Sequence, residues 1–261
     1  MDTDAILDLL KATAAELITP RFRRLSADQV MEKQPGDLVT VADRESEVAI
    51  THALRQHYPD ALILGEEATA TQAGLLPAFA GAEHAFTIDP VDGTKNFVNG
   101  SPDHAVMVAE LRSGQAVRGW IWQPEHQLAY VAEAGAGVYC NGERLTAQPR
   151  SSVTGQIRGA SSTELHGMSP GGLAEVTDSW WCAGVDYTQM LSGATDYLFF
   201  RRDWPWDHVP GALMVAELGG RTGRVDGTRY DPRVRQDWLL SAASEEVFEQ
   251  VRGPVGAALG L

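Results

Sequence analysis

Apolar residues near the start of the chain recur at the three- and four-residue spacing typical of a helix lying on a core. Over residues 4–19 they form one face, and Pro20 ends the pattern. The same spacing returns over 43–58, and a short strand is indicated over 37–41. We therefore expect two amphipathic helices in the N-terminal part.

The pattern changes to that of strands in the middle of the chain. Two apolar runs, over 61–64 and 85–88, each lead directly to acidic residues. Further runs joined by short turns follow over 104–111, 117–122 and 128–132. Asn141-Gly142 is a strong signal for a tight hairpin. This region is expected to form an antiparallel meander.

A polar stretch over 146–156, rich in serine, proline and glycine, suggests a domain boundary. We expect an N-terminal α+β domain over 1–147 and a C-terminal α/β domain over 148–261. In the second half, strands are predicted over 157–160, 197–200, 221–225 and 237–241, and helices over 185–191, 207–218 and 245–251. The expected fold class is therefore a mixture of α+β and α/β structure.

Composition and charge narrow the possible partners. With 261 residues, of which 44% are hydrophobic and 21% charged, the chain is long enough for a large folded core. Its formal net charge of -14 argues against a nucleic-acid-binding or anionic-membrane-binding surface, because both need basic patches. If the substrate is a phosphate, local positive charge has to come from elsewhere, and bound metal ions would supply it.

The cysteines and the N-terminus indicate the compartment. Cys140 and Cys182 form no CxxC pair, so a zinc ribbon or redox dithiol is not expected. The chain begins Met-Asp-Thr-Asp without a basic or long apolar segment, which gives no sign of a signal peptide. No run of about 18 apolar residues predicts a membrane span. We expect a reduced, cytoplasmic protein.

The chemically most informative segment is Ile88-Asp89-Pro90-Val91-Asp92-Gly93-Thr94-Lys95-Asn96-Phe97. Asp89 and Asp92 end a predicted strand, where carboxylates are good ligands for a hard divalent cation. Pro90 fixes the backbone, so that the Val91 carbonyl could point toward the same centre. The Gly-Thr that follows can open a helix, whose free N–H groups suit a phosphate. This combination suggests metal-assisted chemistry on a phosphate ester.

Other acidic residues have simpler explanations. Glu66 and Glu67 follow a predicted strand and could be solvated loop charges. Asp43 and Asp207 each stand at the start of a predicted helix, where an N-cap is the simpler interpretation. Pro210 is expected in the first turn of the second of these helices. Lys95 is either a solvated side chain or a contact for an anionic ligand.

The chain has seven histidines, and none has the spacing of a helical metal motif. The candidate ligand set is therefore all oxygen, which favours magnesium or manganese over zinc or copper. Gly167-Met168-Ser169-Pro170-Gly171 matches the GxSxG pattern of serine hydrolases. It lacks the preceding apolar strand and the following helix, so we expect a polar loop there.

Taken together, these segments resemble the inositol monophosphatase family, within the magnesium-dependent, lithium-sensitive phosphatase superfamily. The main matching strings are GEE at 65–67, DPVDGTKNF at 89–97 and WDHVPGALMVAELGG at 206–220. DLVTVAD at 37–43 and GAGVYCNGERL at 135–145 support them. The resemblance spans most of the chain. It implies a layered αβαβα sandwich of the sugar-phosphatase type, usually a homodimer, with two or three Mg²⁺ per site that Mn²⁺ can replace.

The resemblance also implies roles for individual residues. The metal ligands would be Glu66, Asp89, the Val91 carbonyl, Asp92 and Asp207. Asp43 and Thr94 would position and activate the attacking water, and Glu67 would assist a weaker metal site. The phosphate and substrate contacts would be Gly93, Thr94, Lys95, Ala183 and Asp207.

Three differences from the pattern of inositol-specific members mean that the resemblance does not identify the substrate. Phe200 stands where inositol-specific members have a sugar-binding glutamate, and the pocket loop reads Trp181-Cys182-Ala183-Gly184. Lys95 replaces a threonine and resembles relatives that act on histidinol phosphate or on 3'(2'),5'-bisphosphate nucleotides. The expected activity is hydrolysis of a small inositol, polyol or sugar phosphate, with these two as alternatives. A non-catalytic, cation-dependent binding protein remains a further alternative.

Overall fold

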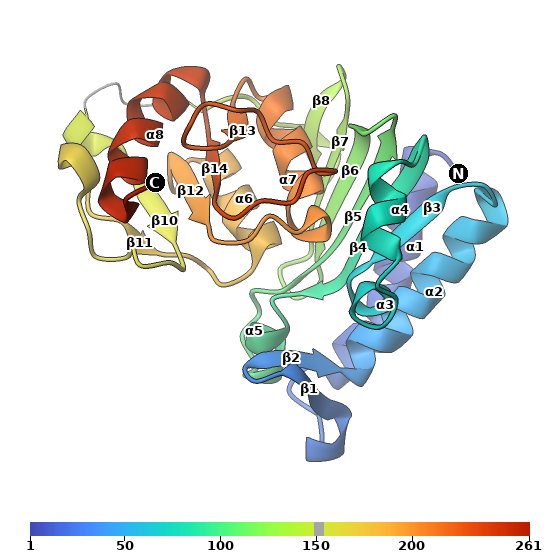
Figure 1. The fold of residues 1–261 in the computed structure, drawn as a ribbon. Helices are drawn as coiled ribbons and strands as arrows, with labels where there is room; N and C mark the ends of the chain where they lie inside the picture. The colour runs from blue at the N-terminus through green and yellow to red at the C-terminus, as the bar shows by residue number, and fades with distance from the viewer. Residues whose placement is uncertain (149–153) are drawn as a thin grey trace.

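The computed structural model describes residues 1–148 and 154–261 as five stacked layers. Figure 1 shows helices α1 (Thr3–Thr13) and α2 (Val41–His57) on one face of a large sheet and α6 (Ala183–Ser192) and α7 (Pro205–Glu217) on the other. A second sheet follows, and α8 (Glu245–Leu259) forms the outer layer. The predicted αβαβα sandwich is confirmed.

The first two helices form where the apolar spacing predicts them. Asp2 accepts a hydrogen bond from the Ala5 amide at the start of α1, and a π-helical turn, Ala14–Ile18, continues the helix. Their apolar faces pack on the large sheet around a buried core that includes Ile6, Leu10, Ile50, Leu54, Phe86, Val108 and Trp120. Burial of this face, rather than helix propensity, holds α1 and α2 in place.

The large sheet has seven strands in the order β3-β4-β5-β6-β7-β8-β9. Their bounds are β3 (Leu62–Gly65), β4 (His84–Asp92), β5 (Ala105–Arg112), β6 (Gln115–Gln123), β7 (Leu128–Glu133), β8 (Gly137–Cys140) and β9 (Glu143–Arg144). β3 and β4 are parallel, and the later pairs are antiparallel, which confirms the meander. Asn141 and Gly142 both have left-handed backbone, with φ of 49° and 82°, as the hairpin turn requires.

Several short elements were not predicted. They are β1 (Val30–Gln34), which pairs with β2 (Asp37–Thr40), and the helices α3 (Glu66–Thr71) and α4 (Leu75–Ala80), whereas α5 (Thr94–Val98) begins at the Gly-Thr that was expected to open a helix. Each has too few residues to show a periodic apolar pattern. In Figure 1 the β1–β2 hairpin and α5 lie together at one end of the large sheet, near α3.

The second sheet has the order β11-β10-β12-β14-β13. Its strands are β10 (Gly159–Ser161), β11 (Thr177–Asp178), β12 (Tyr197–Phe200), β13 (Arg221–Gly223) and β14 (Leu239–Ala242). β10 begins two residues later than predicted, and α8 is longer than its predicted seven-residue pattern. Residues 149–153, around the predicted domain boundary, lie outside the described residues, and the division into two domains stays a prediction.

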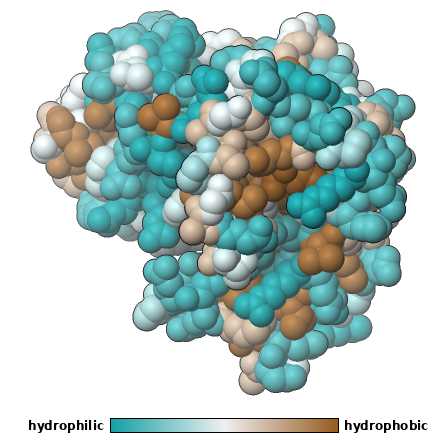
Figure 2. Space-filling model, turned by 45° about the vertical axis from the view of Figure 1, so that its right-hand side comes forward, coloured by the Kyte–Doolittle hydropathy of each residue, from teal (hydrophilic) through white to brown (hydrophobic). Residues whose placement is uncertain are grey.

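The two sheets share one apolar layer, built around α6 and α7, in which Tyr187, Met190 and Met214 are buried. In contrast, Figure 2 shows a face covered largely by hydrophilic side chains, with an apolar area near its centre. Among the described helices, none combines the length and the apolar character needed to cross a bilayer.

Candidate active site

A pocket of about 850 Å³ opens where β3 and β4 end, between the β1–β2 hairpin and the start of α7. Its lining includes Lys33, Glu66, Asp89, Val91, Asp92, Gly93, Thr94, Arg202, Trp204, Trp206 and Asp207. Acidic residues from three separate parts of the chain therefore meet in one cavity, as the resemblance implies.

β4 brings two of the carboxylates to the pocket through an irregularity in its pairing. In a regular strand, residues three apart point to opposite faces. The register between β4 and β5 shifts between Asp89 and Asp92, and the Val91 amide donates to Asp89 Oδ1 at 3.1 Å. This bulge at Pro90 lets both aspartates face the same cavity.

The start of α6 holds Asp92. The Gly184 amide donates to Asp92 Oδ2 at 2.6 Å, the Ala183 amide donates to Oδ1 at 3.2 Å, and the Cys182 thiol contacts Oδ2 at 2.9 Å. Burial raises the pKa of Asp92, although these donors oppose the rise. The predicted substrate residue Ala183 thus lies beside the site, where its backbone orients an acidic side chain.

Asp207 lies in the third position of α7, so it is not the N-cap. Trp204 is the N-cap and Pro205 the first helical residue, because proline suits that position. The helix therefore starts two residues earlier than predicted. The prediction that Pro210 falls in the first turn is wrong, since Pro210 lies inside the helix.

Asp89 and Asp207 lie close together in the lining of the pocket. Burial raises the pKa of both carboxyls well above the usual range, and the negative charges of Glu66 and Asp92 raise it further. Buried carboxyls whose pKa is raised by one another's charge are a sign of negative charge that lacks a compensating cation.

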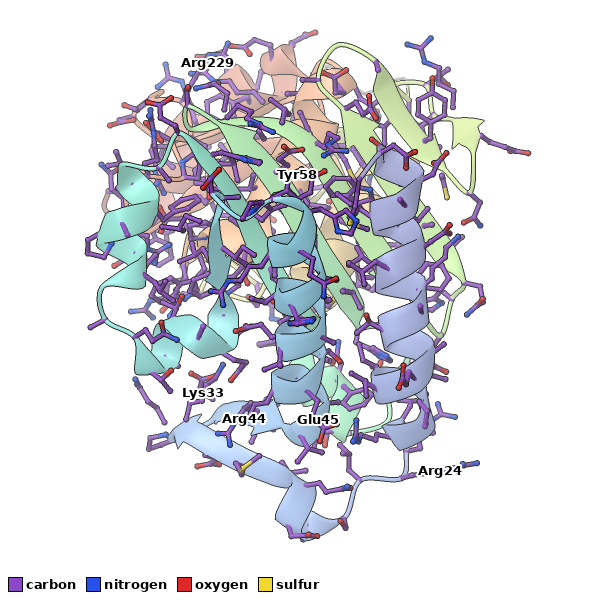
Figure 3. The ribbon with its side chains drawn as sticks, turned by 90° about the vertical axis from the view of Figure 1, so that its right-hand side faces the viewer. Arg24, Lys33, Arg44, Glu45, Tyr58 and Arg229 are labelled. Carbon is purple, nitrogen blue, oxygen red and sulfur yellow. The ribbon has the colours of Figure 1, made fainter. Side chains whose placement is uncertain are left out.

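Lys33 supplies a cation from outside the predicted set. Its ammonium lies 2.6 Å from Glu66 Oε1 and 2.8 Å from Glu67 Oε1. Burial lowers the pKa of Lys33, but the two glutamates outweigh this effect and raise it overall. Figure 3 shows Lys33 on the β1–β2 hairpin below α2 and α3. The sequence offered no signal for this contact, which depends on the unpredicted strand β1.

Glu47, also missed by sequence reasoning, positions the two glutamates. Its carboxylate accepts the Glu67 amide at 2.7 Å and the Ala68 amide at 2.8 Å, at the start of α3. A Cβ on Gly65 would lie 2.3 Å from the Glu47 carboxyl carbon, so this approach requires glycine. Burial raises the pKa of Glu47 to about 7.

Thr94 and Asp43 form the predicted pair. The Thr94 hydroxyl lies 3.0 Å from Asp43 Oδ1 and 3.1 Å from the Val91 carbonyl oxygen, and it can donate to one of them at a time. Asp43 is not an N-cap. Thr40 caps α2, and Asp43 completes a capping box by accepting the Thr40 amide at 2.9 Å. Burial, with the charges of Glu66 and Glu67, raises the pKa of Asp43 to about 7.

Gly93 has φ of 80°, and a Cβ there would come within 2.9 Å of the Cys182 Cβ, so the turn before α5 needs glycine. The Lys95 side chain does not line the pocket, and its ammonium lies 5.5 Å from the centre of the Trp181 ring. Phe200 is buried against Tyr187 and His208, so this departure is part of the core and does not line the pocket.

The donors in the pocket are chemically suited to a hard cation, because they are all oxygen atoms. His208, the neighbour of Asp207, pairs instead with the Arg202 carbonyl and the Tyr187 hydroxyl, and burial lowers its pKa to about 3. Within the described residues, no three acidic, histidine or cysteine side chains are already arranged as a finished metal site. The Lys33 ammonium beside Glu66 and Glu67, and the raised pKa of Asp89 and Asp207, show where positive charge is needed, and this arrangement fits Mg²⁺.

Ser169 lies in an exposed loop that continues into a short 3-10 turn, Pro170–Gly172. Neither a strand before it nor an α-helix after it presents the hydroxyl to a pocket. The expected polar loop is confirmed.

The layered sandwich and the acidic pocket at the end of β4 define the class of sugar-phosphatase-type proteins. The sequence profile of the inositol monophosphatase family matches residues 2–253, and the chain belongs to that family.

Individual relatives agree with this assignment. Inositol-1-monophosphatase of Mesorhizobium japonicum is 31% identical over 240 residues, covering 87% of this chain and 88% of the relative. Nus factor SuhB of Pseudomonas aeruginosa is 31% identical over 229 residues, covering 83% of each. The solved IMPase of Thermotoga maritima has a TM-score of 0.77 at 24% identity, covers 97% of this chain and 98% of that one, and shows the shared fold.

Proposed function

We propose that this protein is a Mg²⁺-dependent phosphomonoester hydrolase that acts on a small-molecule alcohol phosphate, in the class of inositol, polyol and sugar phosphates. The observation that carries the proposal is the convergence of Glu66, Asp89, Asp92 and Asp207 in one pocket beside the Thr94–Asp43 pair. Family membership and the inositol-1-monophosphatase relative support it.

Glu66, Asp89, the Val91 carbonyl, Asp92 and Asp207 would hold Mg²⁺, and Glu67 would assist a weaker third ion. When bound, Mg²⁺ supplies the Lewis acidity that activates water and neutralises charge on the phosphate and the departing alkoxide. Binding requires Lys33 to leave Glu66 and Glu67, because a cation at those carboxylates repels its ammonium.

The remaining steps belong to the chain itself. Thr94 orients the attacking water, and Asp43 accepts its proton, a task suited to a carboxylate whose pKa burial raises to about 7. The backbone amides of Gly93 and Thr94 hold the phosphate at the start of α5. Lys95 follows Thr94 in α5, and the Ala183 amide donates to Asp92, so both side chains would contact the rest of the substrate from the edge of this cradle.

Phosphate release from glycerol 2-phosphate and inositol 1-phosphate, with Mg²⁺ and with a chelator, tests the activity. Thr94→Ala is expected to lower turnover by about a hundredfold, a typical effect of losing a group that assists proton transfer. Mg²⁺ affinity, measured by calorimetry, should change much less. Thr94→Ser is the matched control, because it keeps the hydroxyl.

Loss of Mg²⁺ binding in Thr94→Ala would contradict the water-positioning role. Lithium should inhibit by competing for a metal site, and a homodimer is expected in solution; both follow from the family resemblance. The alternative substrates, histidinol phosphate and 3'(2'),5'-bisphosphate nucleotides, belong in the same screen because Lys95 resembles relatives that act on them.

The likeness to Nus factor SuhB keeps a second candidate: a cation-dependent binding role without turnover. Phosphate release distinguishes the two candidate functions. A binding protein takes up Mg²⁺ but releases no phosphate from any ester in the screen.

A further inference from the structure

Trp181 is a large apolar side chain left open beside the pocket. It precedes α6 and remains 52% exposed, whereas most of the tryptophans in the fold are buried or partly covered. Its backbone is left-handed, with φ of 56°, a conformation that bulky residues rarely adopt. Such a conformation persists only where the surrounding structure enforces it.

Hydrogen bonds to Trp181 and to the residue before it hold that conformation. The Trp181 amide donates to Ser179 Oγ at 3.0 Å, and the Trp180 amide donates to Asp186 Oδ1 at 2.7 Å. The Asn96 side chain, in α5 directly after the phosphate cradle, donates to the Trp180 carbonyl at 2.8 Å. The backbone that carries the indole is therefore tied to the cradle itself.

The same loop touches the reaction centre. Cys182 follows Trp181 directly, and its thiol lies 2.9 Å from Asp92 Oδ2. Its Cβ packs so closely on Gly93 that no side chain fits there. On the other side, the Lys95 ammonium lies over the Trp181 ring. An exposed indole and a cation thus stand together at the edge of the phosphate site.

Trp204 and Trp206 line the pocket itself, but their rings already have partners. They stack on each other with centroids 5.0 Å apart, and the Arg235 guanidinium lies 3.7 Å from the centre of the Trp204 ring. Within the described residues, no other aromatic ring packs on Trp181. Trp181 has the Lys95 ammonium over its ring but no stacked aromatic partner in the described part of the chain, and at 52% exposure it keeps a surface that a ligand can reach.

We propose that Trp181 stacks on a planar aromatic heterocycle in the alcohol part of the substrate, so that the enzyme prefers nucleoside phosphates and related esters to inositol phosphate. The proposal rests on the phosphatase function proposed above. Stacking suits any flat heterocycle because every such ring has a π face. Lys95 contributes a positive charge beside the ring for a second phosphate or an electron-rich ring atom.

The test compares adenosine 3',5'-bisphosphate, histidinol phosphate, inositol 1-phosphate and glycerol 2-phosphate in the wild type, Trp181→Ala and Trp181→Phe. The wild type should have a higher kcat/KM for at least one of the two heterocyclic esters, adenosine bisphosphate and histidinol phosphate, than for the other two. In Trp181→Ala, this preference over glycerol 2-phosphate should fall by about tenfold, mainly through KM. Trp181→Phe keeps an aromatic ring and should restore most of the preference.

A binding measurement separates this proposal from the proposed activity. Calorimetry with adenosine, in the presence of Mg²⁺ and inorganic phosphate, should show binding to the wild type and about tenfold weaker binding to Trp181→Ala. Adenosine bisphosphate and histidinol phosphate distinguish a nucleoside from an imidazole alcohol as the preferred ligand.

Three results would overturn the proposal. They are an equal loss of kcat/KM for all four esters in Trp181→Ala, no wild-type preference for either heterocyclic ester, and adenosine binding that does not depend on Trp181. If glycerol 2-phosphate is hydrolysed normally, such a result leaves the phosphatase function intact. If no ester is hydrolysed, the phosphatase function fails, and the calorimetric result still decides whether Trp181 binds a heterocycle.

Discussion

Two groups of buried carboxylates in this protein are neutralised in different ways. Asp203, only 1% exposed, pairs with the guanidinium groups of Arg224 and Arg235. Four residues further along the chain, Asp207 lies among Asp89, Asp92 and Glu66, and burial with these negative charges raises its pKa well above the usual range. Two aspartates close in sequence therefore differ in their partners: Asp203 is paired with arginines, and Asp207 lies among other carboxyls.

Glu110 extends the comparison within the large sheet. It lies next to β4 but is bonded to Arg118 at 2.5 Å and to Arg112 at 2.9 Å, and these partners lower its pKa although burial opposes them. Carboxylates with permanent arginine partners stabilise the fold. Carboxylates left without them are costly when buried, and such a cost is usually tolerated where a function requires it.

The largest expected effect is on the stability of the arginine-paired cluster. Asp203→Ala leaves the buried Arg224 guanidinium without its carboxylate and should lower the free energy of unfolding by about 3–5 kcal/mol. Chemical denaturation measures the change. Glu175→Ala, at an exposed glutamate, is the control and should change stability by about 0.5 kcal/mol or less. Equal effects of the two substitutions would remove the distinction between the clusters.

Next in size is the effect of Asp92→Asn on turnover. We expect a loss of about a hundredfold or more, because a charged ligand and its electrostatic support are removed. Phosphate release at saturating Mg²⁺ measures it, and a thermal unfolding curve confirms that the variant is folded. A rate near that of the wild type would exclude Asp92 from the metal-binding role.

Metal binding should stabilise the acidic pocket specifically. At Mg²⁺ concentrations of about ten times the dissociation constant, the free energy of unfolding should rise by about 1.4 kcal/mol. Asp89→Asn should abolish most of this gain. Sodium chloride at matched ionic strength is the control for general screening, and an equal gain from it would show that no specific site exists.

The smallest expected effect concerns pH. The pKa of Glu110 is lowered from its ordinary 4.5, so its contribution to stability is present above that pH and is lost as the pH falls through the lowered value. Glu110→Gln should therefore lower stability at neutral pH by about 1 kcal/mol and show a weaker further loss in acid. Denaturation at a series of pH values measures both, and parallel curves for the two proteins would contradict the assignment.

Much of the site could be predicted because it depends on local chemistry. Asp89 and Asp92 stand on either side of a proline, at the end of an apolar strand and before a Gly-Thr, and this combination indicates a ligand site wherever the strand lies. Asp207 shows the limit of such reasoning. Its sequence context favoured a helix cap, and only the actual helix start, at Pro205, showed that its side chain is free to enter the pocket.

The sequence did not indicate the roles of residues whose partners lie in other helices or strands. Lys33 reaches Glu66 from a short polar strand, and Glu47 reaches the Glu67 amide from the preceding helix. In a sequence both resemble ordinary solvated charges, because the partner that gives each its role comes from another element. The same is true of Trp181, whose exposure and left-handed backbone appear only in the folded chain.

The sequence alone determined the order of the main helices and strands, the acidic motifs and the all-oxygen character of the ligand set, since periodicity and residue chemistry are properties of short segments. Tertiary structure decided which charges are neutralised by arginine, which face one another unpaired and which aromatic ring stays open. These outcomes depend on distances between residues far apart in the chain, and only packing of the two sheets against their shared helices sets those distances.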